Sequence, residues 1–173
     1  VFPIVRVGSN EPLLIKKALD AGAHGIIVPM VNTVELAEKA IDSIFYPPKG
    51  NRGVGLSRAQ NYGYSFSKYK EWAEKEIVFI PQIEHYQGVN NIDEILALEN
   101  VDAILVGPYD LSGSLGHPGN WNHPKVLDAI DKINFALNKS EKPFGFHVVH
   151  KDRLEMQNRI NQGYRFIAYG VDM

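Results

Sequence analysis

The amino-acid sequence predicts an α/β fold in which helices connect the strands of a parallel sheet. Short apolar runs rich in β-branched residues recur along the chain, and stretches with helical periodicity separate them. Gly22 and Gly163 directly follow two of these stretches, at positions where helices commonly end in a residue that tolerates a positive φ. Such alternation of strand and helix is typical of repeated βα units.

The expected elements follow one another in the order βαβαβαβαβαβ. Strands are expected at residues 2–7, 24–30, 77–84, 101–107, 143–149 and 165–171. Helices are expected at residues 11–21, 33–42, 88–98, 124–138 and 151–162. One connection, residues 43–76, is long enough to contain a further helix, which we place at 66–75.

These six strands are compatible with two architectures. An open, doubly wound sheet could contain all of them, whereas a (β/α)₈ TIM barrel needs eight strands to close. Because the sequence opens and closes directly on a strand, the barrel interpretation makes residues 1–173 a single partial domain. It would lack the first two βα units and the C-terminal helices.

The composition excludes several functional classes. The net charge is −2 and the six histidines are scattered, which does not favour nucleic-acid binding. The absence of cysteine excludes disulfides, thiolate metal sites and a cysteine nucleophile. No apolar run approaches the roughly 18 residues that a membrane helix needs. We therefore expect a cytoplasmic enzyme that acts on small molecules, without a membrane partner.

Two carboxylates follow neighbouring strands at the point where each strand ends. Glu84 closes the third predicted strand, and Asp110 comes shortly after the fourth. In parallel α/β folds, ligands bind at the carboxyl ends of the strands, so these side chains should converge. Two carboxylates suit Mg²⁺ or Mn²⁺, and such an ion would polarise a 2-oxo acid and stabilise its enolate. Capping of the following helices is an equally good explanation from spacing alone.

Other residues at the strand ends could bind an anionic substrate. Arg6 is the only charged residue in the first apolar run, where it could bind a substrate oxygen or pair with a carboxylate of the fold. Backbone amides of Tyr109 and Asp110, next to Gly107 and Pro108, could receive a substrate carboxylate.

Further candidates carry weaker signals. The glycine-rich turn at residues 52–55 is better explained as structural than as an anion site. His147 and His150 flank the end of the fifth strand, so that one of them could reach the mouth of a barrel. Packing or exposure is nevertheless the more common role of a histidine in such a position.

Several strings, taken together and in order, resemble the HpcH/HpaI aldolase/citrate lyase family. The matching strings are Ile4-Val5-Arg6-Val7 with Asn10-Glu11-Pro12, Val28-Pro29-Met30-Val31, Tyr46-Pro47-Pro48 with Arg52-Gly53-Val54-Gly55, Gln82-Ile83-Glu84, Val106-Gly107-Pro108-Tyr109-Asp110-Leu111-Ser112, and Gly170-Val171-Asp172. They extend over essentially the whole chain. Any one of them alone would carry little weight.

This resemblance implies a metal-dependent (class II) pyruvate aldolase on a TIM barrel, with Mg²⁺, Mn²⁺ or Co²⁺ as cofactor. The family's metal ligands fall on Glu84 and Asp110, its substrate-binding arginine falls on Arg6, and Gln82 matches a glutamine near the site. The amides of Tyr109 and Asp110 would bind the pyruvate carboxylate. The substrates would be a 2-oxo acid and an aldehyde, and the full-length protein would be a trimeric or hexameric homo-oligomer.

One part of the family's machinery has no counterpart here. The His-Asp dyad that serves as the family's base lies in the leading βα units, and no position of this sequence matches it. A citryl- or malyl-CoA lyase-like enzyme, or a catalytically silent barrel that acts as a binding subunit, therefore stays open as an alternative. A Schiff-base mechanism is disfavoured, since no lysine lies within a predicted strand.

Overall fold

The computed structural model describes residues 1–171, in which six parallel strands form one sheet in sequential order. The strands are β1 (Ile4–Arg6), β2 (Gly25–Val28), β3 (Val78–Ile83), β4 (Ile104–Val106), β5 (Phe144–Val148) and β6 (Phe166–Tyr169). Each predicted strand is confirmed, although each is shorter than expected. The observed pairing stops before the residues that form the loops at the strand ends.

The helices alternate with these strands. They are α1 (Pro12–Ala21), α2 (Val34–Ile44), the 3₁₀ helix η1 (Arg58–Gly63), α3 (Phe66–Glu76), α4 (Tyr86–Asn90), α5 (Ile92–Ala97), α6 (Pro108–Ser114), α7 (Pro124–Lys139) and α8 (Arg153–Asn161). Local signals explain several boundaries. Gly22 ends α1 with a φ of 108°, and the carboxylate of Asp152 accepts hydrogen bonds from two amides at the start of α8.

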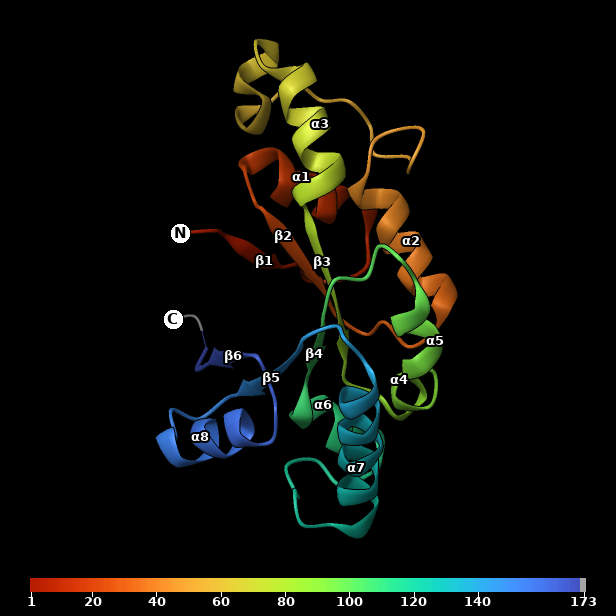
Figure 1. Ribbon diagram of the computed structural model, residues 1–173, viewed down its shortest axis with the longest axis vertical. Coiled ribbons are helices and arrows are strands. Elements are labelled where there is room, and N and C mark those ends of the chain that lie inside the picture. Colours follow the sequence, from red (N-terminus) through yellow and green to blue (C-terminus); the bar gives the residue numbers. More distant parts are fainter. Residues whose placement is uncertain (172–173) are drawn as a thin grey trace.

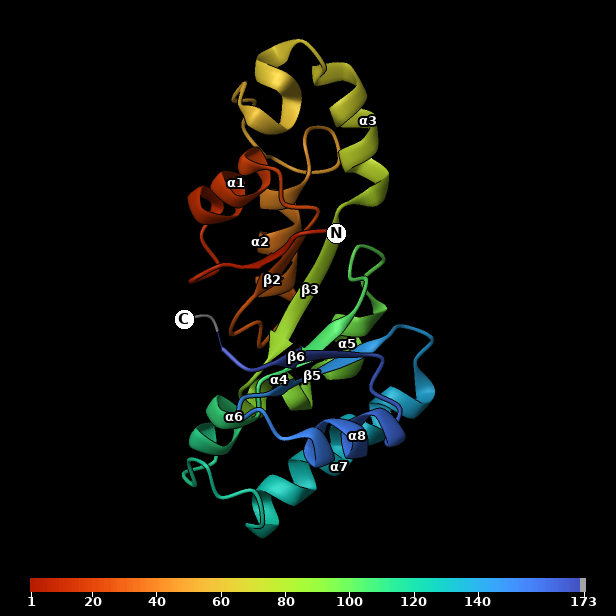
Figure 2. The ribbon, with the colours of Figure 1, turned by 90° about the vertical axis from the view of Figure 1, so that its left-hand side faces the viewer.

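The strand order distinguishes the two architectures that the sequence left open. Doubly wound sheets reverse their strand order, whereas here each strand pairs with the next one along the chain. The sheet curls, with the helices along its outer side (Figure 1), and the strands turn progressively from β1 to β6 (Figure 2). Residues 1–171 thus form a six-stranded half-barrel rather than a doubly wound sheet.

The two faces of the sheet are packed differently. On the outer face, alternate residues of β5, such as Phe144 and Phe146, are fully buried in the main core between sheet and helices. On the inner face, Ile80, Ala103 and Leu105 form a small second cluster. The inner face of β1 is open, since Ile4 is 46% exposed. The inside of the half-barrel is therefore the accessible side of the sheet.

Two helical segments differ from the sequence expectation. The single helix expected at 88–98 is divided into α4 and α5 at Asn91, whose side chain donates a hydrogen bond to the carbonyl of Asn32 at 2.8 Å. A short helix, α6, begins at Pro108, where no helix was expected. The expected helix at 66–75 is confirmed as α3, preceded by η1.

Candidate active site

The carboxylate of Glu84, just beyond β3, is almost completely buried, with the residue only 1% exposed. Oε1 accepts a hydrogen bond from the backbone N–H of Met30 at 2.9 Å, whereas Oε2 is buried without a hydrogen-bond partner. Burial raises the pKa of Glu84, and the negative charge of Asp110 raises it further. A buried carboxylate oxygen without a partner is costly, and a bound cation would remove that cost.

The amide that holds Glu84 comes from a strained turn. Met30, two residues beyond β2, has a φ of 55°, a left-handed conformation that a side chain makes unfavourable. Its side chain is 45% exposed and lines the same hollow as Glu84. The sequence analysis did not assign Met30 a role, because a positive φ at a non-glycine residue leaves no mark in the sequence.

A glycine makes room for the side chains that cross the strand ends. A Cβ added at Gly107 would lie 2.6 Å from Nε2 of Gln82 and 2.8 Å from Oε2 of Glu84, closer than real contacts allow. Gln82 is 5% exposed, and its Oε1 accepts a hydrogen bond from Nε of Arg6 at 3.3 Å. Gly107 thus permits Gln82 and Glu84 to lie against β4, and Gln82 in turn positions Arg6.

Asp110 reaches the site from the first turn of α6. Pro108 is the first residue of this helix, and the amide of Leu111 donates to the carbonyl of Gly107 at 3.1 Å. That bond is the first within the helix, so the amides of Tyr109 and Asp110, which come before Leu111 in the chain, have no partner within the helix. The hydroxyl of Tyr109 lies 2.9 Å from Nε2 of His150. Tyr109 could therefore act on a ligand at the predicted position through its backbone rather than its ring.

A hollow of about 400 Å³ lies at these strand ends. Its lining includes Arg6, Met30, Glu84 and Asp110, which come from four different strand ends. The predicted residues Arg6, Gln82, Glu84, Gly107 and Asp110 are thus brought together, because parallel strands end at a common edge.

The geometry is compatible with a divalent cation. Among residues 1–171, no group of three or more acidic, histidine or cysteine side chains converges on one point, so Glu84 and Asp110 stand as a pair. The free Oε2 of Glu84 and the accessible carboxylate of Asp110 are hard oxygen donors. Mg²⁺ commonly binds through one or two carboxylates and keeps its other positions for water and substrate. The residues present therefore fit such an ion.

Four of the histidines lie in different surroundings. Nδ1 of His85 accepts a hydrogen bond from the amide of Gln87 at 3.3 Å, at the start of α4. His117 and His123 stack in the loop before α7, with ring centroids 3.3 Å apart. His147 lines the inner face of the half-barrel beside Arg6 and Asp110. Of the two histidines at the end of β5, His147 is therefore the one next to the candidate site.

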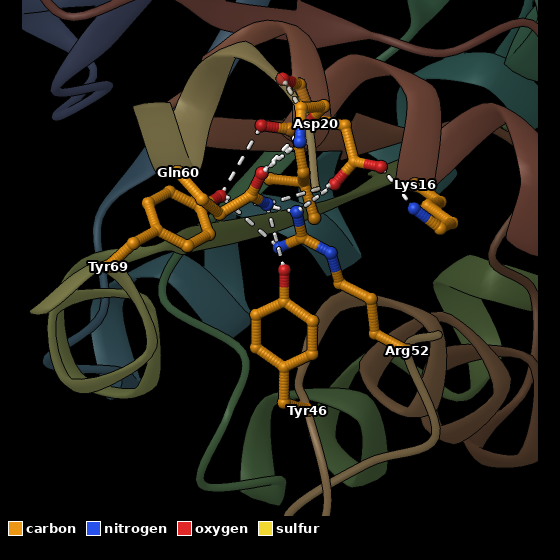
Figure 3. A network of polar contacts seen from close by, with 8 residues as sticks. Lys16, Asp20, Tyr46, Arg52, Gln60 and Tyr69 are labelled. Atoms are coloured by element: carbon orange, nitrogen blue, oxygen red, sulfur yellow. Dashed lines mark hydrogen bonds and ion pairs between the residues drawn. The ribbon is translucent and has the colours of Figure 1, made fainter. Parts of the chain in front are cut away.

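A second buried charge lies away from this site, in the glycine-rich segment (Figure 3). Nη2 of Arg52 pairs with Oδ1 of Asp20 at 2.6 Å, and both Nη atoms lie 3.3 Å from the hydroxyl of Tyr69. The guanidinium also lies 4.5 Å from the ring centroid of Tyr46. These contacts link α1, α3 and the loop after α2. They favour the structural explanation of residues 52–55.

Comparison with known proteins agrees with the resemblance seen in the sequence. The model of the HpcH/HpaI aldolase/citrate lyase family matches residues 1–173. The chain belongs to this family. The 5-keto-4-deoxy-D-glucarate aldolase of Escherichia coli O139:H28 (strain E24377A / ETEC) is 41% identical over 171 residues, which cover 99% of this chain and 66% of that protein.

Solved structures of this HpcH/HpaI family share the fold. The crystal structure of a family protein from Burkholderia cenocepacia J2315 is 34% identical, with a TM-score of 0.91, and the match covers 99% of this chain and 67% of that one. The chain thus spans about two thirds of the length of these HpcH/HpaI relatives. Asp172, which closes the last family string, lies outside the described residues.

A more distant structure contains a metal. The citrate lyase beta subunit of M. tuberculosis, solved with oxaloacetate and magnesium, has a TM-score of 0.61 and covers 95% of this chain and 65% of that one. At 14% identity this likeness shows a common fold alone.

Every helix within residues 1–171 is too short or too polar to cross a membrane.

Proposed function

We propose that this chain is the larger part of a metal-dependent aldolase that reversibly cleaves a 4-hydroxy-2-oxo acid to pyruvate and an aldehyde. Membership of the HpcH/HpaI family supports the reaction class. The observation that carries the metal dependence is Glu84, a buried carboxylate with one oxygen bonded and the other without a partner. Asp110, from the neighbouring strand end, supplies the second carboxylate.

The cofactor in this proposal is a divalent cation, Mg²⁺ or Mn²⁺, with Co²⁺ as a further candidate. Glu84 and Asp110 would hold it through carboxylate oxygens. When bound, the ion would polarise the 2-oxo group and stabilise the negative charge of the enolate.

The other residues would bind and orient the substrate. The guanidinium of Arg6, held by Gln82, would offset negative charge that develops on the substrate oxygen. The amides of Tyr109 and Asp110, in the turn after Gly107 and Pro108, would donate hydrogen bonds to the substrate carboxylate. No histidine of this chain is assigned as the base, since family membership predicts that group in a segment not represented here.

The greater length of the relatives supports a closed eight-stranded barrel for the full-length protein. Within residues 1–171, β1 and β6 each pair with only one neighbour, so further strands can be added at both edges. We extend the proposal to a homo-oligomer of such barrels, as the family resemblance predicts.

The test is exchange of the C3 protons of pyruvate with solvent deuterium, followed by NMR on the full-length protein with Mg²⁺ or Mn²⁺ and with a chelator. We expect exchange that requires the metal and falls by at least about 10²-fold in Glu84→Gln, because a neutral amide holds the ion less well than a carboxylate and the ion would supply several kcal/mol of charge stabilisation. Glu71→Gln is the matched control, since Glu71 is an exposed residue of α3 remote from the strand ends.

The possible outcomes separate the proposal from its alternatives. Exchange that survives both the chelator and Glu84→Gln would contradict the metal site. Covalent trapping of pyruvate by borohydride would indicate a Schiff base. Proton exchange of an acyl-CoA but not of pyruvate would favour a lyase-like enzyme, and no exchange with any metal would favour a silent barrel.

A further inference from the structure

A second hollow lies on the inner face of the half-barrel and adjoins the candidate active site. Its volume is about 340 Å³, and Arg6 and Asp110 line both hollows. Much of the remaining wall is apolar and includes Leu105 and Ala168. His147 is the one histidine in this wall. A substrate bound at Arg6 and Asp110 therefore has room to extend past His147.

The sheet register places His147 level with Glu84 and Gly107 at the carboxyl ends of the strands. Ile83 pairs with Val106, and Val106 pairs with Phe146. The residues that follow these three, Glu84, Gly107 and His147, therefore lie side by side at the ends of β3, β4 and β5. Because the neighbours Phe146 and Val148 are fully buried in the outer core, strand alternation directs His147 inward.

A hydrogen bond determines which nitrogen of His147 carries the proton. Nε2 lies 2.9 Å from the carbonyl oxygen of Gly170. A carbonyl oxygen only accepts, so Nε2 must be the donor in this contact. The carbonyl is itself held in place, because the amide of Gly170 donates to the carbonyl of Val148 at 2.9 Å. In the neutral imidazole, Nδ1 then has a lone pair, and it has no hydrogen-bond partner among residues 1–171.

We propose that Nδ1 of His147 accepts a hydrogen bond from a hydroxyl group on the aldehyde-derived part of the substrate. His147 would then be a specificity-determining residue that selects hydroxylated aldehydes over their deoxy analogues. This inference rests on the proposed aldolase function. An acceptor in an apolar wall discriminates because a deoxy substrate displaces its water and leaves it unpaired.

The test compares glycolaldehyde with acetaldehyde, which differ by one hydroxyl group, as aldol acceptors for pyruvate in the full-length protein with Mg²⁺. The measured quantity is kcat/KM for glycolaldehyde divided by kcat/KM for acetaldehyde. We expect His147→Leu to lower this ratio by about 10- to 100-fold, which corresponds to one lost hydrogen bond to a half-buried acceptor. His147→Asn should keep most of the selectivity, because Oδ1 of asparagine can occupy the position of Nδ1 and accept the same hydrogen bond.

Exchange of the pyruvate C3 protons, which involves no aldehyde, should be close to wild type in both variants. A ratio that is unchanged in His147→Leu, with exchange intact, would overturn the inference and leave the aldolase function standing. Equal losses for both aldehydes together with lost exchange would also overturn it, since His147 would then act in enolate formation. Absence of exchange in the wild type would instead contradict the proposed function itself.

Discussion

Two charged side chains are buried within residues 1–171, and they are in opposite states: Arg52 lies between α1 and α3, and Glu84 lies at the strand ends. The side chain of Arg52 is 0% exposed, and its Nη atoms bond to Asp20 and Tyr69. Glu84 is 1% exposed, has one oxygen bonded to an amide and the other unbonded, and lies near a second carboxylate. One charge is neutralised within the fold, whereas the other is surrounded by an arrangement that a cation would complete.

A structural charge and a functional charge therefore differ in whether the fold itself supplies the opposite charge. A buried charge that is paired with an opposite charge, as Arg52 is with Asp20, fixes elements relative to one another even though Nε of Arg52 has no hydrogen-bond partner. A buried carboxylate that the fold leaves partly unsatisfied is maintained at a cost to stability. Substitutions at Arg52 and at Glu84 should therefore change the melting temperature of the metal-free protein in opposite directions.

The largest effect is expected for Arg52→Met. Loss of the guanidinium removes the ion pair between Arg52 and Asp20 and leaves Asp20 with Lys16 as its remaining cation. Breaking a buried pair costs about 3 kcal/mol. For a domain of this size, a loss of that magnitude lowers the melting temperature by about 6–12 °C. Thermal denaturation checks this, with Lys132→Met as control, because the exposed Lys132–Asp128 pair should contribute no more than about 1 kcal/mol. Equal shifts in both variants would contradict the structural role of Arg52.

A second prediction concerns Gly107→Ala. The added methyl group would overlap with Gln82 and Glu84, so both side chains must move. We expect metal affinity to fall by about 10- to 100-fold, as is usual when the support of a metal ligand is disturbed. Titration calorimetry with Mn²⁺ measures this, and Gly113→Ala is the control because a Cβ there meets nothing closer than 4.0 Å. Unchanged affinity in Gly107→Ala would exclude this glycine as the residue that makes room for the ligand.

A smaller loss of Mn²⁺ affinity is expected when Met30, whose amide bonds to Glu84, is substituted. Met30→Val should weaken Mn²⁺ binding, because a β-branched residue tolerates a φ of 55° poorly and the amide would leave Oε1 of Glu84. The strain of such a conformation is on the order of 1–3 kcal/mol. Met30→Gly removes that strain and should keep the affinity of the wild type. If the two variants bind Mn²⁺ equally well, the backbone of Met30 does not position the ligand.

The smallest effect is expected for Glu84→Gln in the metal-free protein, where the substitution should raise the melting temperature rather than lower it. Burial raises the pKa of Glu84, so its ionised form destabilises the fold above that pKa, and the penalty disappears as the pH falls through it. Glu84→Gln should therefore raise the melting temperature at neutral pH, with an advantage that shrinks on acidification.

The pH dependence of Asp20 has the opposite sign. Burial alone would raise its pKa, but hydrogen bonds from Lys16 and Arg52 outweigh burial and lower it. The stabilisation by Asp20 is thus fully present above the unfolded-state pKa and is lost as the pH falls through the folded-state pKa. Asp20→Asn should destabilise the protein at neutral pH. Melting curves of both variants between acidic and neutral pH test the pair, and shifts of the same sign would contradict the comparison.

The number, order and type of the strands could be predicted without the structure, because each strand is a short and largely apolar run and helix-periodic stretches separate these runs. Chain order also predicted that Glu84 and Asp110 lie close together, since they follow consecutive strands. It left helix capping open, and only the family resemblance indicated a metal site. The division of residues 88–98 at Asn91 escaped prediction, because it depends on a hydrogen bond to Asn32, 59 residues away in the sequence.

Only the folded structure shows which of these residues lie close together and whether their charges are neutralised. It showed that the sheet curls in sequential order, that Met30 supplies a bond to Glu84 from another strand end, and that Arg52 is neutralised within the fold. It also turned His147 inward and fixed its proton on Nε2. These properties depend on distances and burial between segments far apart in the chain, and local sequence patterns report only on neighbours.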